Sequence, residues 1–125
     1  MLGKFDAVAN LAVRDIATAR KFYEGVLGLA EADSQDGELV AYRSGASMLF
    51  VYRSDYAGTN QATAVTWVVG DQIDAVARAL ADKGVAFEHY HMPDTTREGD
   101  VHVGHGMRVA WFKDPDGNIL NIADG

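Results

Sequence analysis

Leu11-Ala-Val-Arg-Asp15 and Val65-Thr-Trp-Val-Val69-Gly-Asp71 are the two stretches that decide the fold of this 125-residue chain. Each stretch is an apolar run of strand length that ends at an aspartate, and apolar residues at helical spacing follow it. Both aspartates stand where a helix N-cap accepts backbone N–H groups, and they are 56 residues apart. This spacing predicts two copies of one supersecondary unit.

Working outward from these stretches, the first half reads as strand, helix and three strands. The helix begins at Asp15 and ends at Gly28, and turns at Asp36-Gly37 and Gly45 separate the later strands. In the second half, Asp71 is the predicted cap of a helix that ends at Gly84, and Pro93–Gly106 reads as a long polar loop of the kind that forms a functional lid. The predicted strands are Ala7–Val13, Leu29–Asp33, Glu38–Arg43, Ser47–Arg53, Ala62–Val69, Val85–His89, Met107–Lys113 and Asn118–Ile122.

The predicted fold class is therefore α+β. Two βαβββ modules, at about residues 5–54 and 62–123 of a single domain spanning 1–125, would form a curved mixed sheet with the helices outside. The concave inner face would be the natural ligand site. A single α+β sandwich without a cleft is the alternative.

Charge and composition exclude several classes of protein. The chain has 18 acidic and 11 basic residues, and Lys and Arg form no basic patch in the sequence, so we expect no nucleic-acid partner and a ligand that is neutral or cationic. No apolar stretch is long enough to span a membrane, and the N-terminus lacks the apolar core of a signal peptide, so a cytoplasmic location is expected. The absence of cysteine excludes disulfides, thiolate metal sites and a cysteine nucleophile.

Three segments together resemble the vicinal oxygen chelate superfamily, which includes glyoxalase I, extradiol dioxygenases, fosfomycin-modifying enzymes and bleomycin-resistance proteins. The first runs from Leu11–Asp15 into Phe22-Tyr23-Glu-Gly-Val-Leu-Gly28-Leu29, and the second is Val65–Asp71. The third is Phe112-Lys-Asp114-Pro115-Asp116-Gly117-Asn118, which is similar to the family's C-terminal turn. The resemblance covers essentially the whole chain and implies the paired-module fold.

The resemblance also implies a divalent metal, held by His or Gln on the first strand of each module and Glu on the last. Those positions fall on Val8, Ala64 and Asn121, with Leu49 or Phe50 as the fourth. Valine, alanine, leucine and phenylalanine cannot coordinate a metal, so we expect no metal, no cofactor and no catalytic residue of the usual kind. This pattern favours the metal-free antibiotic-binding members, which sequester a drug.

Enzymatic alternatives stay open at this point. The chain could be a glyoxalase-like lyase or isomerase with a displaced or absent metal, for which His89, His91, His102 and His105 would be a non-standard cluster. It could also be a catalytically inactive regulatory domain. No Gly-x-Ser-x-Gly motif supports nucleophilic catalysis.

Strand alternation selects the side chains that would face the groove. Trp67 is expected beneath the second helix, and Trp111 is the expected stacking platform. We expect a small organic ligand, aromatic or cationic, in a groove completed by a homodimer. The predicted ligand-binding residues are Asn10, Tyr42, Phe50, Tyr52, Thr66, His102, Met107, Val109, Trp111 and Asn121.

Overall fold

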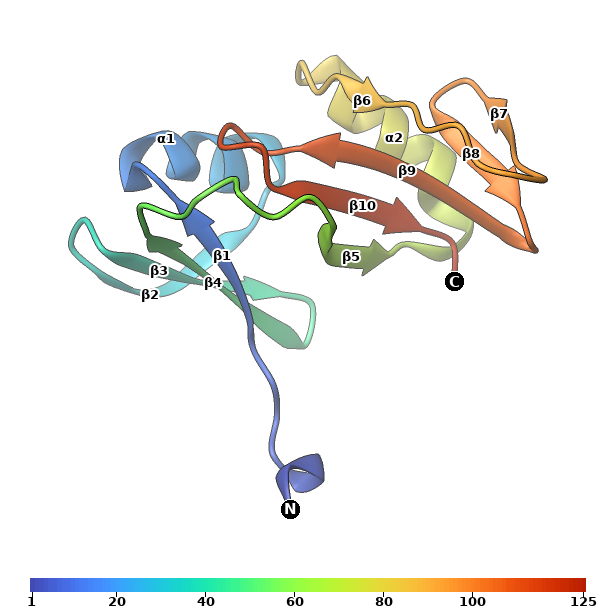
Figure 1. Ribbon diagram of the computed structural model, residues 1–125. Coiled ribbons are helices and arrows are strands. Elements are labelled where there is room, and N and C mark those ends of the chain that lie inside the picture. Colours follow the sequence, from blue (N-terminus) through green and yellow to red (C-terminus); the bar gives the residue numbers. More distant parts are fainter. The chain divides into compact units, whose positions relative to one another are not determined.

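A computed structural model describes residues 1–125, which form two compact units, Met1–Thr59 and Asn60–Gly125. Ten strands form two mixed sheets, one in each unit, and each unit also has one α-helix (Figure 1). The α+β class predicted from the sequence is confirmed. Neither helix has the length and apolar character that crossing a membrane requires.

The first unit has a four-stranded sheet in the order β1-β4-β3-β2, in which β1 runs parallel to β4 and the other neighbours are antiparallel. Its helix continues into a turn of wider π-helix. The elements are η1 (Leu2–Lys4), β1 (Ala9–Val13), α1 (Ile16–Arg20), η2 (Lys21–Val26), β2 (Ala30–Gln35), β3 (Leu39–Ser44) and β4 (Ser47–Arg53).

The predicted cap of the first helix is confirmed. The Asp15 carboxylate accepts hydrogen bonds from the Thr18 backbone N–H at 2.9 Å and the Thr18 hydroxyl at 2.7 Å. These bonds from Thr18 stabilise the charged form and hold the pKa of Asp15 below its usual value. The helical segment ends before Gly28, whose φ of +75° suits a residue without a Cβ.

The core of the first unit lies between its sheet and its helical segment. Leu11 and Val13 of β1 are buried there, as their alternation predicts, and so is Tyr23 of η2. Tyr42 is also fully buried, and its hydroxyl donates to a Glu24 carboxylate oxygen at 2.7 Å. Burial, followed by this bond to a carboxylate, raises the pKa of Tyr42 well above its ordinary value. Tyr42 is therefore a core residue, which corrects its assignment to the groove.

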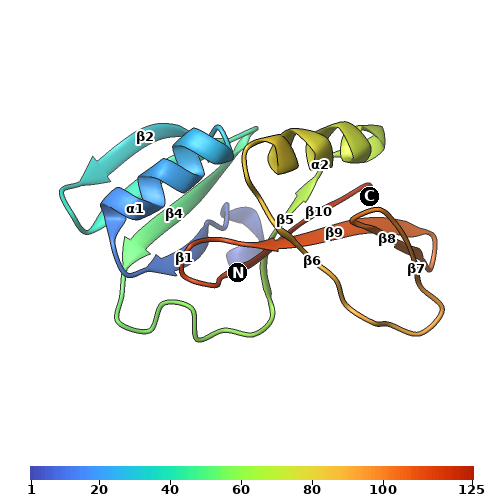
Figure 2. The same ribbon diagram turned by 90° about the horizontal axis from the view of Figure 1, so that it is seen from above.

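The second unit has a sheet in the order β5-β10-β9-β8-β7, with β6 pairing along β9. Strand β5 is parallel to β10, and the remaining pairs are antiparallel. Helix α2 packs on β9 and β10 through Ile73, Ala77 and Leu80 (Figure 2). The elements are β5 (Thr63–Val68), η3 (Gly70–Gln72), α2 (Ile73–Asp82), β6 (Phe87–Glu88), β7 (Thr96–Glu98), β8 (Val101–Gly104), β9 (Met107–Lys113) and β10 (Ile119–Ala123).

The two units repeat one topology, because β1, β3 and β4 have the same pairings as β5, β9 and β10. The second helix departs from the predicted start. Asp71 lies in the 3₁₀ turn η3, whereas α2 begins at Ile73 and has no side-chain cap. Gly70, with a φ of +60°, turns the chain just before Asp71.

The segment predicted as the long loop Pro93–Gly106 is largely a β-hairpin. Strands β7 and β8 pair from Thr96 opposite Val103 to Glu98 opposite Val101, and Gly99 turns the chain with a φ of +64°. All of β7 is exposed, so it has no apolar alternation by which a strand is recognised. The preceding strand is shorter than predicted, since β6 comprises only Phe87–Glu88.

Candidate functional site

The face of the second sheet that is turned away from α2, here called the open face, has its side chains in cross-strand rows. One row is Thr66, Asn121 and Trp111 on β5, β10 and β9. The next row runs through Val68, Ala123 and Val109 to His102 on β8. Alternation places these side chains together on one face.

A cavity of about 720 Å³ lies over this open face. Its volume falls within the usual range for pockets that hold drug-sized organic molecules. Every lining residue belongs to the second unit. They are Thr66, Val68, Met92, Pro93, Thr95, His102, Gly104, His105, Met107, Val109, Trp111, Asn121, Ala123 and Gly125.

The lining side chains are apolar or uncharged, and none is Asp, Glu, Lys or Arg. A charged ligand would lose hydration here without gaining a partner of opposite charge, which costs several kcal/mol. The lining side chains therefore offer no ion pair to the cationic ligand that the net charge of the chain also allowed.

His102 is the most deeply buried polar residue of the cavity, at 2% exposed. Its Nε2 accepts a hydrogen bond from the Tyr90 backbone N–H at 3.0 Å. Since an accepting ring nitrogen has no proton, this bond places the proton of the neutral ring on Nδ1. Nδ1 has no hydrogen-bond partner within the protein. His102 thus has a fixed orientation and an unused N–H donor.

Asn121 is the second polar residue of this kind. Its side chain is 8% exposed, and its Oδ1 has no hydrogen-bond partner within the protein. A buried polar atom left unpaired costs about 1–3 kcal/mol. Both residues line the cavity, so their unpaired atoms are the polar groups of this site whose hydrogen bonds the protein leaves unmade.

The indole ring of Trp111 is oriented by one hydrogen bond and two edge-to-face ring contacts. Its Nε1–H donates to the Thr63 hydroxyl at 3.1 Å, and its ring meets Tyr90 and His102 edge-to-face, with centroids 5.3 and 5.0 Å apart. Only partly buried, the indole is a preoriented aromatic surface beside His102. Such a surface suits a flat ring, because offset stacking adds about 0.5–1.5 kcal/mol beyond area burial.

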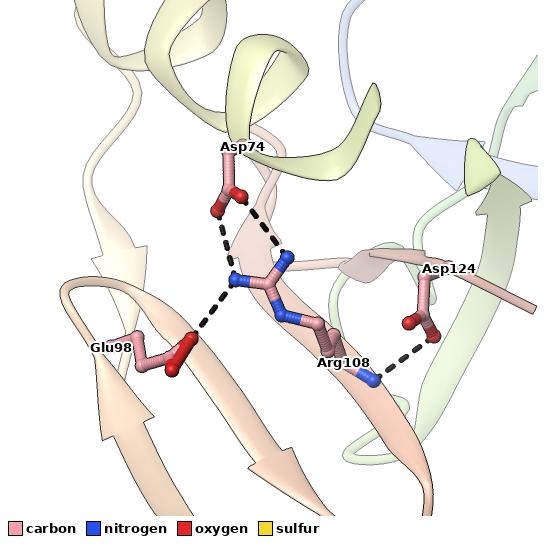
Figure 3. A network of polar contacts seen from close by, with 4 residues as sticks. All are labelled: Asp74, Glu98, Arg108 and Asp124. Carbon is pink, nitrogen blue, oxygen red and sulfur yellow. Dashed lines mark hydrogen bonds and ion pairs between the residues drawn. The ribbon is translucent and has the colours of Figure 1, made fainter. Parts of the chain in front are cut away.

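The side chain of Arg108 lies on the face of β9 that is turned towards α2, away from the cavity. Arg108 forms hydrogen bonds with three acidic residues (Figure 3). Its guanidinium donates two hydrogen bonds of 3.0 Å to Asp74 on α2 and one of 3.1 Å to Glu98 on β7. The bidentate bond from Arg108 holds the pKa of Asp74 below its usual value. The Arg108 backbone N–H donates to the Asp124 carboxylate at 3.0 Å. One side chain thus ties the hairpin that contains His102 to α2.

The base of the hairpin closes tightly. A Cβ on Gly104 would lie 2.7 Å from the Asp94 carbonyl oxygen, so only glycine fits there. Asp94 and His105 both adopt positive φ, at 57° and 53°. His105 Nε2 lies 3.2 Å from the Pro93 carbonyl oxygen, to which it can donate. These contacts fix where β8 meets the cavity.

The structure brings together only part of the predicted site. Thr66, His102, Met107, Val109, Trp111 and Asn121 all line the cavity of the second unit. Asn10, Phe50 and Tyr52 lie in the first unit, on the face of its sheet away from Tyr42. Trp67 is half-buried and points to the α2 side of β5, whereas its neighbour Thr66 points to the open face.

Sequence reasoning missed several contributors. Ala123 could have been found by extending the last strand one residue beyond Ile122, because it alternates with Asn121. Tyr90 and Met92 follow a two-residue strand, where no periodicity exists to orient them. The role of Thr63 depends on the irregular pairing between Ile119 and Leu120, which a sequence pattern does not reveal.

The family model described as the Glyoxalase/Bleomycin resistance protein/Dioxygenase superfamily matches residues 4–122. The chain belongs to this superfamily. No curated protein sequence matches the chain significantly.

Solved structures share the superfamily fold. A lactoylglutathione lyase from Agrobacterium tumefaciens has a TM-score of 0.73 at 20% identity, covering 100% of this chain and 96% of its own. An integron cassette protein from the mobile metagenome of the Halifax Harbour sewage outfall has a TM-score of 0.71 at 18% identity, covering 96% and 97%. The fosfomycin resistance protein FosX from Mesorhizobium loti has a TM-score of 0.68 at 14% identity, covering 100% and 94%.

The metal positions that the superfamily resemblance implies do not fit a metal here. Asn10 pairs with Phe50 just as Thr66 pairs with Asn121, so Phe50 is the first-unit counterpart of Asn121. The four positions are then Val8, Phe50, Ala64 and Asn121, of which only Asn121 has a donor atom. A divalent metal requires several imidazole or carboxylate ligands.

The four histidines do not form a substitute metal site, because no three His, Asp or Glu side chains are arranged to hold a metal. His89 Nε2 lies 2.7 Å from an Asp100 carboxylate oxygen, and His102 Nε2 is occupied by the Tyr90 N–H. His105 contacts the Pro93 carbonyl, and His91 is exposed. The rings of His89 and His102 lie with their centroids 6.3 Å apart, but no third ligand joins them.

Proposed function

We propose that this superfamily member binds a neutral, largely apolar aromatic molecule in the cavity of its second unit. The observation that carries this proposal is the cavity itself: about 720 Å³, lined without charged side chains and walled by the preoriented Trp111. Burial of an aromatic ligand there is favourable by about 25 cal/mol for each Å² of apolar surface removed from water.

Sequestration of an antibiotic is the biological role that we propose for this binding. It needs a cavity but no metal and no catalytic group, which agrees with the residues at the metal positions. The similarity in fold to a fosfomycin resistance protein is compatible with a resistance role.

A lyase or other enzyme is the second candidate, since a lactoylglutathione lyase shares the fold. The observation that favours it is the neutral His102, whose N–H could donate to a reacting oxygen. Turnover of a bound compound would support the enzyme, and recovery of the compound unchanged would support sequestration.

Thermal unfolding in the presence of antibiotics and planar aromatic compounds tests the proposal. A ligand that binds only the folded protein must raise its melting temperature, by an amount that grows with concentration. We expect neutral aromatic compounds to produce the largest shifts and to quench the fluorescence of Trp111. Shifts confined to charged, non-aromatic compounds would contradict the proposal.

We also propose a homodimer. Val68 and Met107 at the cavity are 70% and 45% exposed, and apolar side chains of this kind suit a surface that a second copy covers. Light scattering at micromolar concentration should give twice the mass of the chain. A monomeric mass would contradict this part of the proposal.

A further inference from the structure

The open face combines the Trp111 surface with two buried polar atoms that have no partner, the His102 Nδ1–H donor and the Asn121 Oδ1 acceptor. Each of these atoms lacks a hydrogen bond that a folded protein normally provides, and both residues line the same cavity. A ligand that provides the missing partners gains free energy that an equally large hydrocarbon does not.

The register of the strands sets the direction in which such a ligand must lie. Asn121 lies opposite Trp111, and His102 lies opposite Val109, two residues further along β9. With about 4.8 Å between strands and about 3.4 Å per residue, the Cα atoms of Asn121 and His102 are about 12 Å apart. Both side chains belong to the open face, so a ligand that reaches both must lie across β9.

We infer that the ligand is a planar, neutral aromatic compound with a carbonyl oxygen on one edge of a ring and an N–H on the opposite edge. Its carbonyl accepts from His102 Nδ1, its N–H donates to Asn121 Oδ1, and its ring stacks on Trp111. This inference rests on the proposed function and adds to it the polarity and the direction of the bound molecule.

The binding of two isosteric tricyclic probes tests the donor edge. Acridone has a carbonyl and an opposed ring N–H, whereas xanthone has the same carbonyl but a ring oxygen in place of the N–H. We expect acridone to bind roughly tenfold more tightly than xanthone, because only acridone can donate to Asn121. The Asn121→Leu variant should bind the two probes with equal affinity.

The histidine edge is tested by two variants that separate its nitrogens. Asparagine places a polar atom where Nδ1 lies, and glutamine places one where Nε2 lies. His102→Gln should keep the bond from the Tyr90 N–H, and hence the melting temperature, but bind both probes roughly tenfold more weakly. His102→Asn should show the reverse, with near-normal affinity and a lower melting temperature.

The results also distinguish this inference from the proposed function. Equal affinities of acridone and xanthone for the unmodified protein, or normal binding by His102→Gln, would overturn the inference. In either case, quenching of Trp111 by both probes would leave the proposed function standing. If neither probe bound at its solubility limit, the inference and the proposed aromatic site would both be wrong.

Discussion

The two units have the same backbone topology, but corresponding cross-strand rows of their sheets contain different side chains. In the first unit the row Asn10, Phe50 and Ala41 crosses β1, β4 and β3. In the second unit the corresponding row is Thr66, Asn121 and Trp111. In the first unit the aromatic side chain of this row is Phe50 on β4, the strand paired with β1. In the second unit it is Trp111 on β9, and the amide Asn121 on β10 occupies the position that corresponds to Phe50.

The edges of the two sheets differ even more. Strand β3 is bordered by β2, which is almost entirely exposed, whereas β9 is bordered by β6 and by the hairpin β7–β8. That hairpin contributes His102 and Gly104 to the cavity. The comparison teaches that the repeated backbone supplies a common framework, while the added hairpin and a few open-face residues give the second unit its chemistry.

The largest expected effect concerns Tyr42, which belongs to the core of the first unit. Tyr42→Ala should lower the free energy of unfolding by about 3–5 kcal/mol, because it leaves a cavity beside Tyr23. Tyr42→Phe, which removes only the bond to Glu24, should cost about 1–2 kcal/mol. Urea unfolding measures both. A stable Tyr42→Ala protein that had lost ligand binding would return Tyr42 to the site.

The second prediction separates the two faces of the second sheet. Trp111→Ala should weaken the binding of a planar aromatic ligand at least tenfold, about 1.4 kcal/mol, with a small loss of stability. Trp67→Ala, on the α2 side, should instead destabilise the protein by about 2 kcal/mol and leave affinity unchanged. Titration calorimetry and urea unfolding together measure the pair. Equal losses of affinity in both variants would show that the assignment of faces is wrong.

The third prediction concerns the hairpin that the first unit lacks. Arg108→Met keeps much of the side chain's bulk but removes the bonds to Asp74 and Glu98. Hydrogen exchange of β7 and β8 should accelerate, while exchange in the first unit stays unchanged. Ligand affinity should fall a few-fold, since His102 lies on β8.

The Arg108 network should also depend on pH. The pKa of Asp74 is lower in the folded protein, so the bond to Arg108 stabilises the fold above the ordinary carboxyl value of 3.8. That contribution is lost as the pH falls through the folded pKa, below 3.8. In Arg108→Met this acid-induced loss of stability, followed by urea unfolding at several pH values, should largely disappear, and its persistence would assign the effect to another carboxylate.

The smallest expected effect compares the two helix starts. Asp15→Ala should lower the melting temperature slightly, because Thr18 loses both of its bonds to the carboxylate. Asp71→Ala is the matched control and should have no effect, since α2 has no side-chain cap. A matching loss in both variants would mean that Asp71 caps α2 in solution.

Much of the fold could be predicted because the repeat shows in local sequence patterns, namely the spacing of the helix starts and the alternation along the strands. The spacing from Asp15 to Asp71 exposed the two units, and strand Met107–Lys113 was predicted with its observed bounds. Its alternation correctly separated Arg108, which faces α2, from Trp111 and Val109, which face the cavity. Period-two patterns are reliable where one face of a strand is buried and the other is not.

The site was harder to predict for two physical reasons. Tyr42 was misplaced because an aromatic residue on a strand satisfies a core as well as a groove, and only the register of β3 against β4 decides between them. The hairpin was read as a loop because β7 is exposed on both faces. The unpaired nitrogen of His102 depends on a backbone N–H twelve residues away, which no local pattern encodes.

The hairpin β7–β8 is closed at its base by Gly104, and Asp94 and His105 near that base have positive φ. These constraints fix the backbone at the base and not at the tip. Its outer strand β7 pairs only with β8, so the bond from Arg108 to Glu98 is the side-chain contact that a change at the tip must preserve. A change of residue at His102 would then alter which edge of a ligand is recognised, while Trp111 and the repeat stay as they are. One short hairpin at the surface thus contributes to the cavity without being part of the repeated framework.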